Sequence, residues 1–193
     1  DITDIIDFDV VAWIKAEMRI MLDEELARAI LIGDGRLASD DDKISEDHIR
    51  PVATDAELYT IKAPIKVAQA ATNAQIAKEF IDTAVRSRKN YKGSGTPTLF
   101  TTEDFLTEML LLEDTIGHKL YKSAEDLATA MRVSKIVTVE AMEDDQITVS
   151  GTAYQLAGVI VNLMDYNVGA DKGGAVSLFE DFDIDYNQEK YLI

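Results

Sequence analysis

Hydrophobic positions recur at helical spacing over a long stretch near the start of the chain. Residues 10–32 contain no glycine or proline and are rich in alanine, leucine, methionine, glutamate and arginine, which favour helices. The apolar positions form one stripe that consists of Val10, Ile14, Met18, Met21 and Leu22 and is widened by Trp13, Ala16, Ile20, Ala27 and Ile30. Asp9 is suited to cap this helix and Gly33 to end it. The pattern predicts a helix of roughly 35 Å at a rise of 1.5 Å per residue.

Shorter periodic segments follow a polar loop at 33–54. Apolar residues at helical spacing predict helices over 72–91, 102–112 and 124–131. Runs rich in β-branched or aromatic residues predict strands at 58–68 (interrupted by Pro64), 96–101, 136–139, 147–149 and 159–163. Residues 176–191 alternate between apolar and acidic side chains and predict a half-exposed strand pair, with a hairpin turn before it at 171–174. This order of elements predicts an α+β fold.

Composition narrows the classes of partner. The 193 residues carry 19 Lys and Arg against 36 Asp and Glu, a formal net charge of −17. Nucleic-acid phosphates and anionic membrane surfaces repel such a chain, so neither is an expected partner. The apolar runs are far shorter than the ~18 residues that suggest a membrane-spanning helix. Because the chain has no cysteine, a disulfide scaffold, thiolate metal ligands and a cysteine nucleophile are excluded.

Three local motifs invite a chemical interpretation. Residues 33–38 match GxGxxA, but they follow a predicted helix rather than a strand, so we interpret them as a glycine helix stop. The alternating aspartates of 181–185 are spaced like the start of a calcium loop, yet Tyr186 stands where that loop needs glycine. The acidic residues of 40–48 could bind a divalent cation, although charge runs are usually solvated.

The side chains that commonly perform catalysis lack the spacing their chemistry needs. His48 and His118 are far apart in the sequence and do not have metal-ligand spacing. Ser150 is not framed by a nucleophile elbow, and no Walker lysine follows the glycines around Ser94. The sequence therefore predicts no catalytic, cofactor-binding or metal-binding residue, and a structural or interaction role is favoured over an enzyme.

A few residues are candidates for contacts with other subunits. Trp13 lies on the broad apolar face of the long helix, where tryptophan can serve as an interface anchor or as core packing. Glu24 and Arg28 stand four residues apart and are expected to form a favourable pair on the helix surface. Asp171 and Lys172, at the predicted hairpin turn, complete the set.

Several segments, in collinear order, are similar in sequence to one protein family. They are residues 11–36 (VAWIKAEMRIMLDEELARAILIGDGR), 93–102 (GSGTPTLFTT), 109–121, 166–174 and 179–193 (FEDFDIDYNQEKYLI). In these segments the chain resembles tailed-bacteriophage major capsid proteins of the Hong Kong ninety-seven fold. The first segment resembles the family's spine helix, the next two its axial domain, and the last two the return into its peripheral domain.

This resemblance implies an organisation and a role. It implies a peripheral domain with the spine helix and acidic loop (1–65), an axial domain (66–165) and return strands (166–193). The function implied is that of a non-enzymatic subunit that self-assembles into the hexamers and pentamers of an icosahedral phage or prophage head. Such a protein acts in the virion capsid, and in the host cytoplasm during assembly, with a scaffold or maturation protease as further partners.

The resemblance also frames the alternatives. The family has an N-terminal arm and an extended loop before the spine helix, so we expect this chain to be a core fragment without them. The same fold would serve an encapsulin-type nanocompartment shell protein. From a different class, an acidic metal-dependent hydrolase would use the carboxylates of 40–47 or 181–185.

Overall fold

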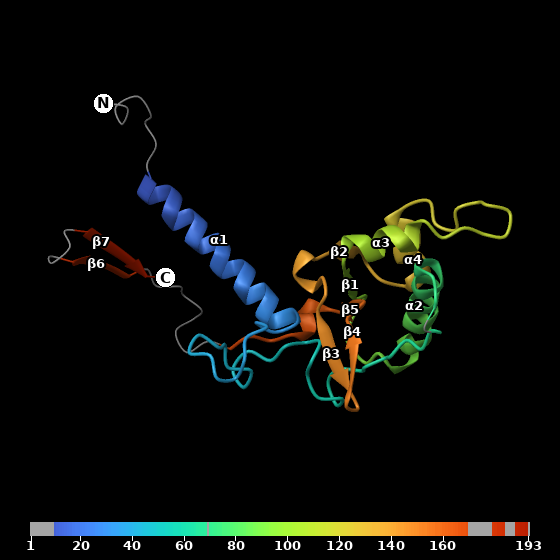
Figure 1. The fold of residues 1–193 in the computed structure, drawn as a ribbon, viewed down its shortest axis with the longest axis horizontal. Coiled ribbons are helices and arrows are strands. Elements are labelled where there is room, and N and C mark those ends of the chain that lie inside the picture. Colours follow the sequence, from blue (N-terminus) through green and yellow to red (C-terminus); the bar gives the residue numbers. More distant parts are fainter. Residues whose placement is uncertain (1–9, 69, 170–178, 184–187, 193) are drawn as a thin grey trace, which may run out of the picture.

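The fold is α+β, in agreement with the order of elements in the sequence. A computed structural model describes residues 10–68, 70–169, 179–183 and 188–192 (Figure 1). Its helices are α1 (Val10–Leu31), α2 (Asn73–Ser87), α3 (Glu103–Leu110) and α4 (Ala124–Met131), with 3-10 turns η2 (Arg88–Asn90), η3 (Glu140–Met142) and η4 (Leu163–Asp165). Its strands are β1 (Thr98–Thr101), β2 (Ile136–Thr138), β3 (Gln146–Val149), β4 (Thr152–Gln155), β5 (Gly158–Val161), β6 (Phe179–Asp183) and β7 (Gln188–Leu192).

The long helix predicted near the start of the chain is confirmed as α1, with 22 residues. It ends where expected, because Gly33 adopts φ +103°, a left-handed conformation that favours glycine. The Gly33 amide donates to the Arg28 carbonyl at 3.1 Å, which satisfies a carbonyl group of the last turn. Asp9 lies outside the described residues. Figure 1 shows α1 as a straight rod that meets the rest of the molecule only near its C-terminal end.

A three-stranded sheet forms the centre of the body. Its strand order is β2-β1-β5, with β1 parallel to β2 and antiparallel to β5. Successive side chains of β1 point to opposite faces, so Leu99 and Phe100 contact two different cores. The first core contains α2, α3 and α4, and its largest fully buried side chains include Leu127 and Met131. The second core lies on the other face and joins the end of α1, residues 52–53, η3 and β3.

Polar caps set the start of the helices that cover the first face. The Thr72 hydroxyl accepts from the Gln75 amide at 3.3 Å, and the Gln75 side chain accepts from the Thr72 amide at 2.9 Å, which forms a capping box. Thr102 caps α3 and Ser123 caps α4 through the hydroxyl alone, which accepts from the Phe105 and Asp126 amides respectively. The predicted helix over 72–91 is shorter than expected, since α2 ends at Ser87 and continues as the 3-10 turn η2.

The strand predicted over 58–68 is wrong. The segment is irregular, and within the described chain none of its peptide groups from 61 to 66 forms a hydrogen bond. It connects the second core, which contains Ala53, with the first core, against which Ile65 packs. A segment that crosses from one face of a sheet to the other does not run along a neighbouring strand, and Pro64 lacks an amide to donate.

Two small antiparallel pairs complete the structure. The β3–β4 hairpin pairs Ile147 with Tyr154, and its second strand was not among the predicted strands. The strand pair predicted over 176–191 is confirmed as β6–β7, which pairs Phe179 with Leu192. Figure 1 shows β6–β7 on the side of the molecule where α1 lies, away from the central sheet. The turn at 171–174, with Asp171 and Lys172, lies outside the described residues.

Candidate interaction surface

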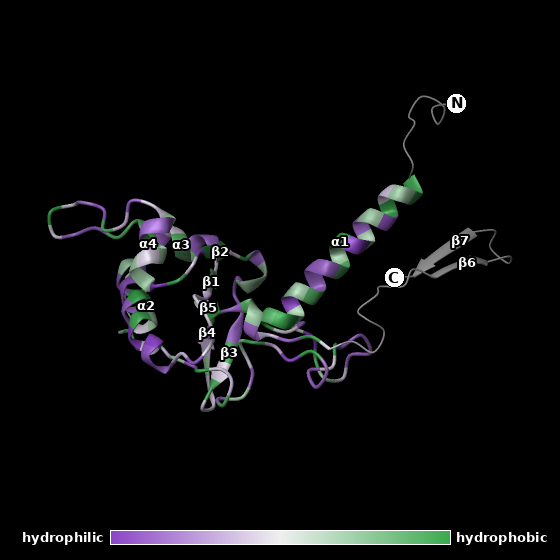
Figure 2. Cartoon of the chain, turned by 180° about the vertical axis from the view of Figure 1, so that it is seen from behind, coloured by the Kyte–Doolittle hydropathy of each residue, from purple (hydrophilic) through white to green (hydrophobic). Residues whose placement is uncertain are grey.

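The surface that stands out chemically is the apolar exposed part of α1. Only Ala29 and Leu31 of this helix are buried. The prediction of one apolar stripe is wrong, because the apolar side chains of α1 are spread around the helix. Val10, Trp13, Ile20 and Met21 are exposed by 52%, 52%, 51% and 62%. Figure 2 shows hydrophobic residues along the whole rod, including the part that stands clear of the body. Exposed large apolar side chains on one element are typical of a surface that another chain covers.

The structure places the predicted interaction residues of α1 on the surface of the helix. Trp13, Glu24 and Arg28 are all exposed on the helix. The expected Glu24–Arg28 pair is wrong, because no ion pair joins these two described residues. The Arg28 guanidinium instead lies against Gly35, where an added Cβ would come within 2.9 Å of its Nη2. Arg28 therefore faces the base of the helix rather than the preceding turn.

A buried carboxylate that the sequence did not single out organises the base of α1. Asp34 follows Gly33, and its side chain is only 1% exposed. It accepts from the Lys43 ammonium at 2.6 Å and from the Ile44 amide at 2.7 Å. The Arg36 amide donates to the same carboxylate at 3.2 Å. These bonds fold residues 34–44 into a closed loop at the end of the helix.

The groups of this loop that surround Asp34 lower the pKa of its carboxyl. Burial alone would raise the pKa of Asp34, but the Lys43 ammonium and the Ile44 and Arg36 amides lower it to about 2. The Arg36 guanidinium extends the cluster, since it contacts Glu25 of α1 at 2.6 Å and Asp42 at 3.1 Å. The loop is thereby joined to α1 by ionic contacts as well as by the chain itself.

Several carboxylates of the acidic loop 40–48 form internal contacts of the same kind. Asp40 accepts from the Leu37 amide at 2.8 Å, and Glu46 accepts from Lys43 at 2.9 Å. Asp181 and Asp183 lie in β6, and Asp185 is outside the described residues. Among the described residues, no three His, Asp or Glu side chains come together in a way that could hold a metal ion. None of the helices in the described ranges has the length and apolar character needed to cross a bilayer.

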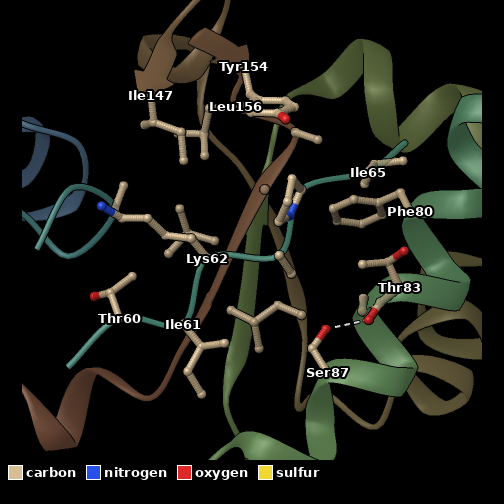
Figure 3. A pocket seen from close by; sticks show the side chains of 18 of the residues that line it. Thr60, Ile61, Lys62, Ile65, Phe80, Thr83, Ser87, Ile147, Tyr154 and Leu156 are labelled. Atoms are coloured by element: carbon tan, nitrogen blue, oxygen red, sulfur yellow. Dashed lines mark hydrogen bonds between the residues drawn. The ribbon is translucent and has the colours of Figure 1, made fainter. Parts of the chain in front are cut away.

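A pocket of about 1300 Å³ lies beside β5. Residues 57–65 cross it and form one wall, which we call the strap; α2 and the β3–β4 hairpin form the others. Figure 3 shows Phe80 and Thr83 of α2 on one side, Ile147 and Tyr154 of the hairpin on another, and the strap residue Lys62 between them. The sequence analysis predicted a strand for the strap and did not indicate a pocket here.

A polar cluster closes one end of this pocket. The Asp165 carboxylate accepts from the Ser94 amide at 2.8 Å and from its hydroxyl at 2.5 Å. The Asn162 side-chain amide donates to the Ser94 carbonyl at 2.7 Å. Burial raises the pKa of the neighbouring Tyr91, and the charge of Asp165 adds to this effect. The hydroxyl of Ser94 has a carboxylate but no histidine beside it, so the cluster holds the Gly93–Gly95 turn rather than forming a nucleophilic site.

Comparisons with known proteins do not assign the chain to a family. A scan against protein-family models finds no match, and searches of curated proteins and of solved structures find none.

Proposed function

We propose that this chain is a major capsid protein of the Hong Kong ninety-seven fold, the structural subunit of a tailed-phage or prophage head. The observation that carries the proposal is α1, a 22-residue rod with only Ala29 and Leu31 buried. Such a helix exposes more apolar surface than a monomer needs, and repeated copies of one contact set are what build a symmetric shell. The collinear resemblance in sequence supports the same function.

In this proposal α1 is the spine helix of a peripheral domain, and the body around β1 and β5 is the axial domain. The α+β architecture and the placement of β6–β7 on the α1 side of the molecule support this division. Trp13, Ile20 and Met21 would contact a neighbouring subunit, since aromatic and methionine side chains are enriched at interfaces. The acidic composition would keep packed DNA from adhering to the shell wall.

The experiment is to purify this chain, and the complete product of its gene where that is longer, and to follow assembly by sedimentation velocity and negative-stain electron microscopy. We expect rings or shells whose amount rises with protein concentration. The double substitution Ile20→Ser/Met21→Ser should abolish assembly. The control is Leu163→Ser/Met164→Ser, an adjacent apolar pair of comparable exposure (53% and 83%) on η4. A complete product that stays monomeric under all assembly conditions would refute the proposal.

A further inference from the structure

The pocket beside β5 exposes a strand edge that nothing in the described chain occupies. The central sheet ends at β5, because its strand order is β2-β1-β5. The open edge of such a strand is a row of amide donors and carbonyl acceptors that an added strand can pair with. The residues of β5 all line the pocket, as does the strap.

The hydrogen bonds that β1 makes on its β2 side decide which groups of β5 face outward. The Leu99 amide donates to the Lys135 carbonyl at 3.0 Å. The Thr101 carbonyl accepts from the Val139 amide at 2.8 Å. The peptide groups of Leu99 and Thr101 therefore point to β2, and the alternate residues of β1 point to β5.

The register of the antiparallel pair then assigns the two edges of β5. Val159 and Val161 lie opposite the β1 residues that face β5, so their peptide groups bond back to β1. Gly158 and Ile160 lie between them and present their N–H and C=O groups to the pocket. Gly158 also keeps this edge close to α2, since an added Cβ would lie 3.0 Å from the Phe80 ring.

The strap offers a second unpaired backbone to the same pocket. Its peptide groups from Ile61 to Ile65 form no hydrogen bond with other described residues. The pocket, at about 1300 Å³, is larger than the ~300–1,000 Å³ of ordinary small-molecule sites. An extended segment of chain is the ligand whose donors and acceptors match two such edges, because a strand presents them alternately to both sides.

The charged side chains that line the pocket indicate which kind of peptide segment would bind there. The lining includes more acidic than basic side chains: Glu57, Asp104, Glu108, Glu143, Asp144 and Asp165 against Lys62, Arg88 and Lys92. Apolar side chains line the space between them, among them Ile65, Phe80 and Leu156. We propose that the pocket between β5 and the strap binds an extended peptide of alternating basic and apolar residues by strand addition. The proposal does not depend on assembly of the chain into a shell.

The test is calorimetric titration of the full chain with the peptide acetyl-Lys-Val-Lys-Val-Lys-Val-amide at low ionic strength. Matched probes carry Glu in place of Lys, or N-methyl groups on either all Val or all Lys residues. We expect the Lys peptide to bind at least about tenfold more tightly than the Glu peptide. Each N-methylated peptide should bind about tenfold more weakly than its parent, because each set of methyl groups blocks one hydrogen-bonded edge.

The protein side of the test uses the acidic rim. Glu143→Gln/Asp144→Asn should weaken binding of the Lys peptide several-fold, and Asp41→Asn/Asp47→Asn, which removes the same charge far from the pocket, should not. Amide hydrogen exchange should show new protection of Gly158, Ile160 and the strap. The proposal is overturned by failure of the Lys peptide to bind, by equal binding of the Glu or N-methylated peptides, or by protection of strap amides before peptide is added. A chain that never assembles yet binds the peptide refutes only the proposed function.

Discussion

Helix α1 is more apolar in composition than α2, yet less of it is buried. The shorter helix, α2, starts at a capping box and buries Ala77, Phe80 and Ile81 in the first core. The longer helix, α1, has 22 residues but buries only Ala29 and Leu31. The difference shows that apolar content alone does not determine burial. The apolar residues of α2 gather on one face that packs on the core, whereas those of α1 are spread around the helix.

This contrast has a thermodynamic consequence. Tertiary packing supplies most of the stability of a helix in a protein, so α2 should open only when the body unfolds. The outer turns of α1 have few buried neighbours and depend on intrinsic helix propensity and on the base of the helix. Substitutions in the tightly packed body and in the outer turns of α1 should therefore lower the free energy of unfolding by very different amounts.

The largest effect is expected where β1 meets the helical layer. Leu99 is fully buried in the first core. Leu99→Ala should lower the free energy of unfolding by about 2–5 kcal/mol, because it leaves a cavity in a close-packed core. The measurement is urea denaturation followed by far-UV circular dichroism. Met21→Ala on α1 is the comparison, and equal losses for the two variants would mean that α1 is packed as tightly as the body.

The base of α1 should respond to acid. The pKa of Asp34 falls from 3.8 in the unfolded chain to about 2 in the fold. A carboxylate with a lowered pKa contributes stability that is present above pH ~4 and is lost as the pH falls toward ~2. The covering loop is itself exposed, so solvent screening reduces the contribution to about 1–2 kcal/mol. Stability measured from pH 5 to 2 should show this loss, and Asp34→Asn should remove that part of the pH dependence. A parallel pH profile for both proteins would contradict the assignment.

A smaller loss is expected at the start of α2. Thr72→Ala removes the hydroxyl that accepts from the Gln75 amide, and should cost about 1 kcal/mol in the free energy of unfolding. Thr115→Ala replaces an exposed threonine outside any helix and serves as the control in the same denaturation experiment. If both variants unfold at the same urea concentration, the cap contributes nothing to stability.

The smallest effect on folding is expected on the exposed face of α1. Ile20→Ser replaces a side chain that is 51% exposed, and should change the free energy of unfolding of the dissociated chain by less than about 0.5 kcal/mol. The measurement must be made at a protein concentration where sedimentation shows monomers. A loss comparable to that of Leu99→Ala would place Ile20 in a core and would weaken the argument for an uncovered surface.

Local signals in the sequence predicted much of the fold. The α1 boundary at Gly33 and the α4 boundaries follow from propensity and capping chemistry, which act over a few residues. The strand predicted at 58–68 fails because pairing depends on a distant partner, and this segment crosses between two cores instead. The β4 strand was missed for the opposite reason, since it has few apolar residues and is defined by its pairing with β3.

The site was harder to predict than the fold. The importance of Asp34 depends on Lys43, nine residues away, and no spacing rule indicates that this pair is buried. One signal was present, because a charged residue between two glycines follows directly on an apolar helix end. The open edge of β5 has no signal in the sequence of β5 itself, since an edge is a property of the sheet.

The ionic contacts of Asp34 and Arg36, which follow Gly33, fix only one end of α1, and this has a mechanical consequence. A helix of 22 residues is about 33 Å long at 1.5 Å per residue, and it is held at one end. A tilt of the helix by about 5° at this end would move its other end by ~3 Å. Small changes in the Lys43–Asp34–Arg36 contacts at the base of α1 would therefore displace its far end more than any other part of the helix.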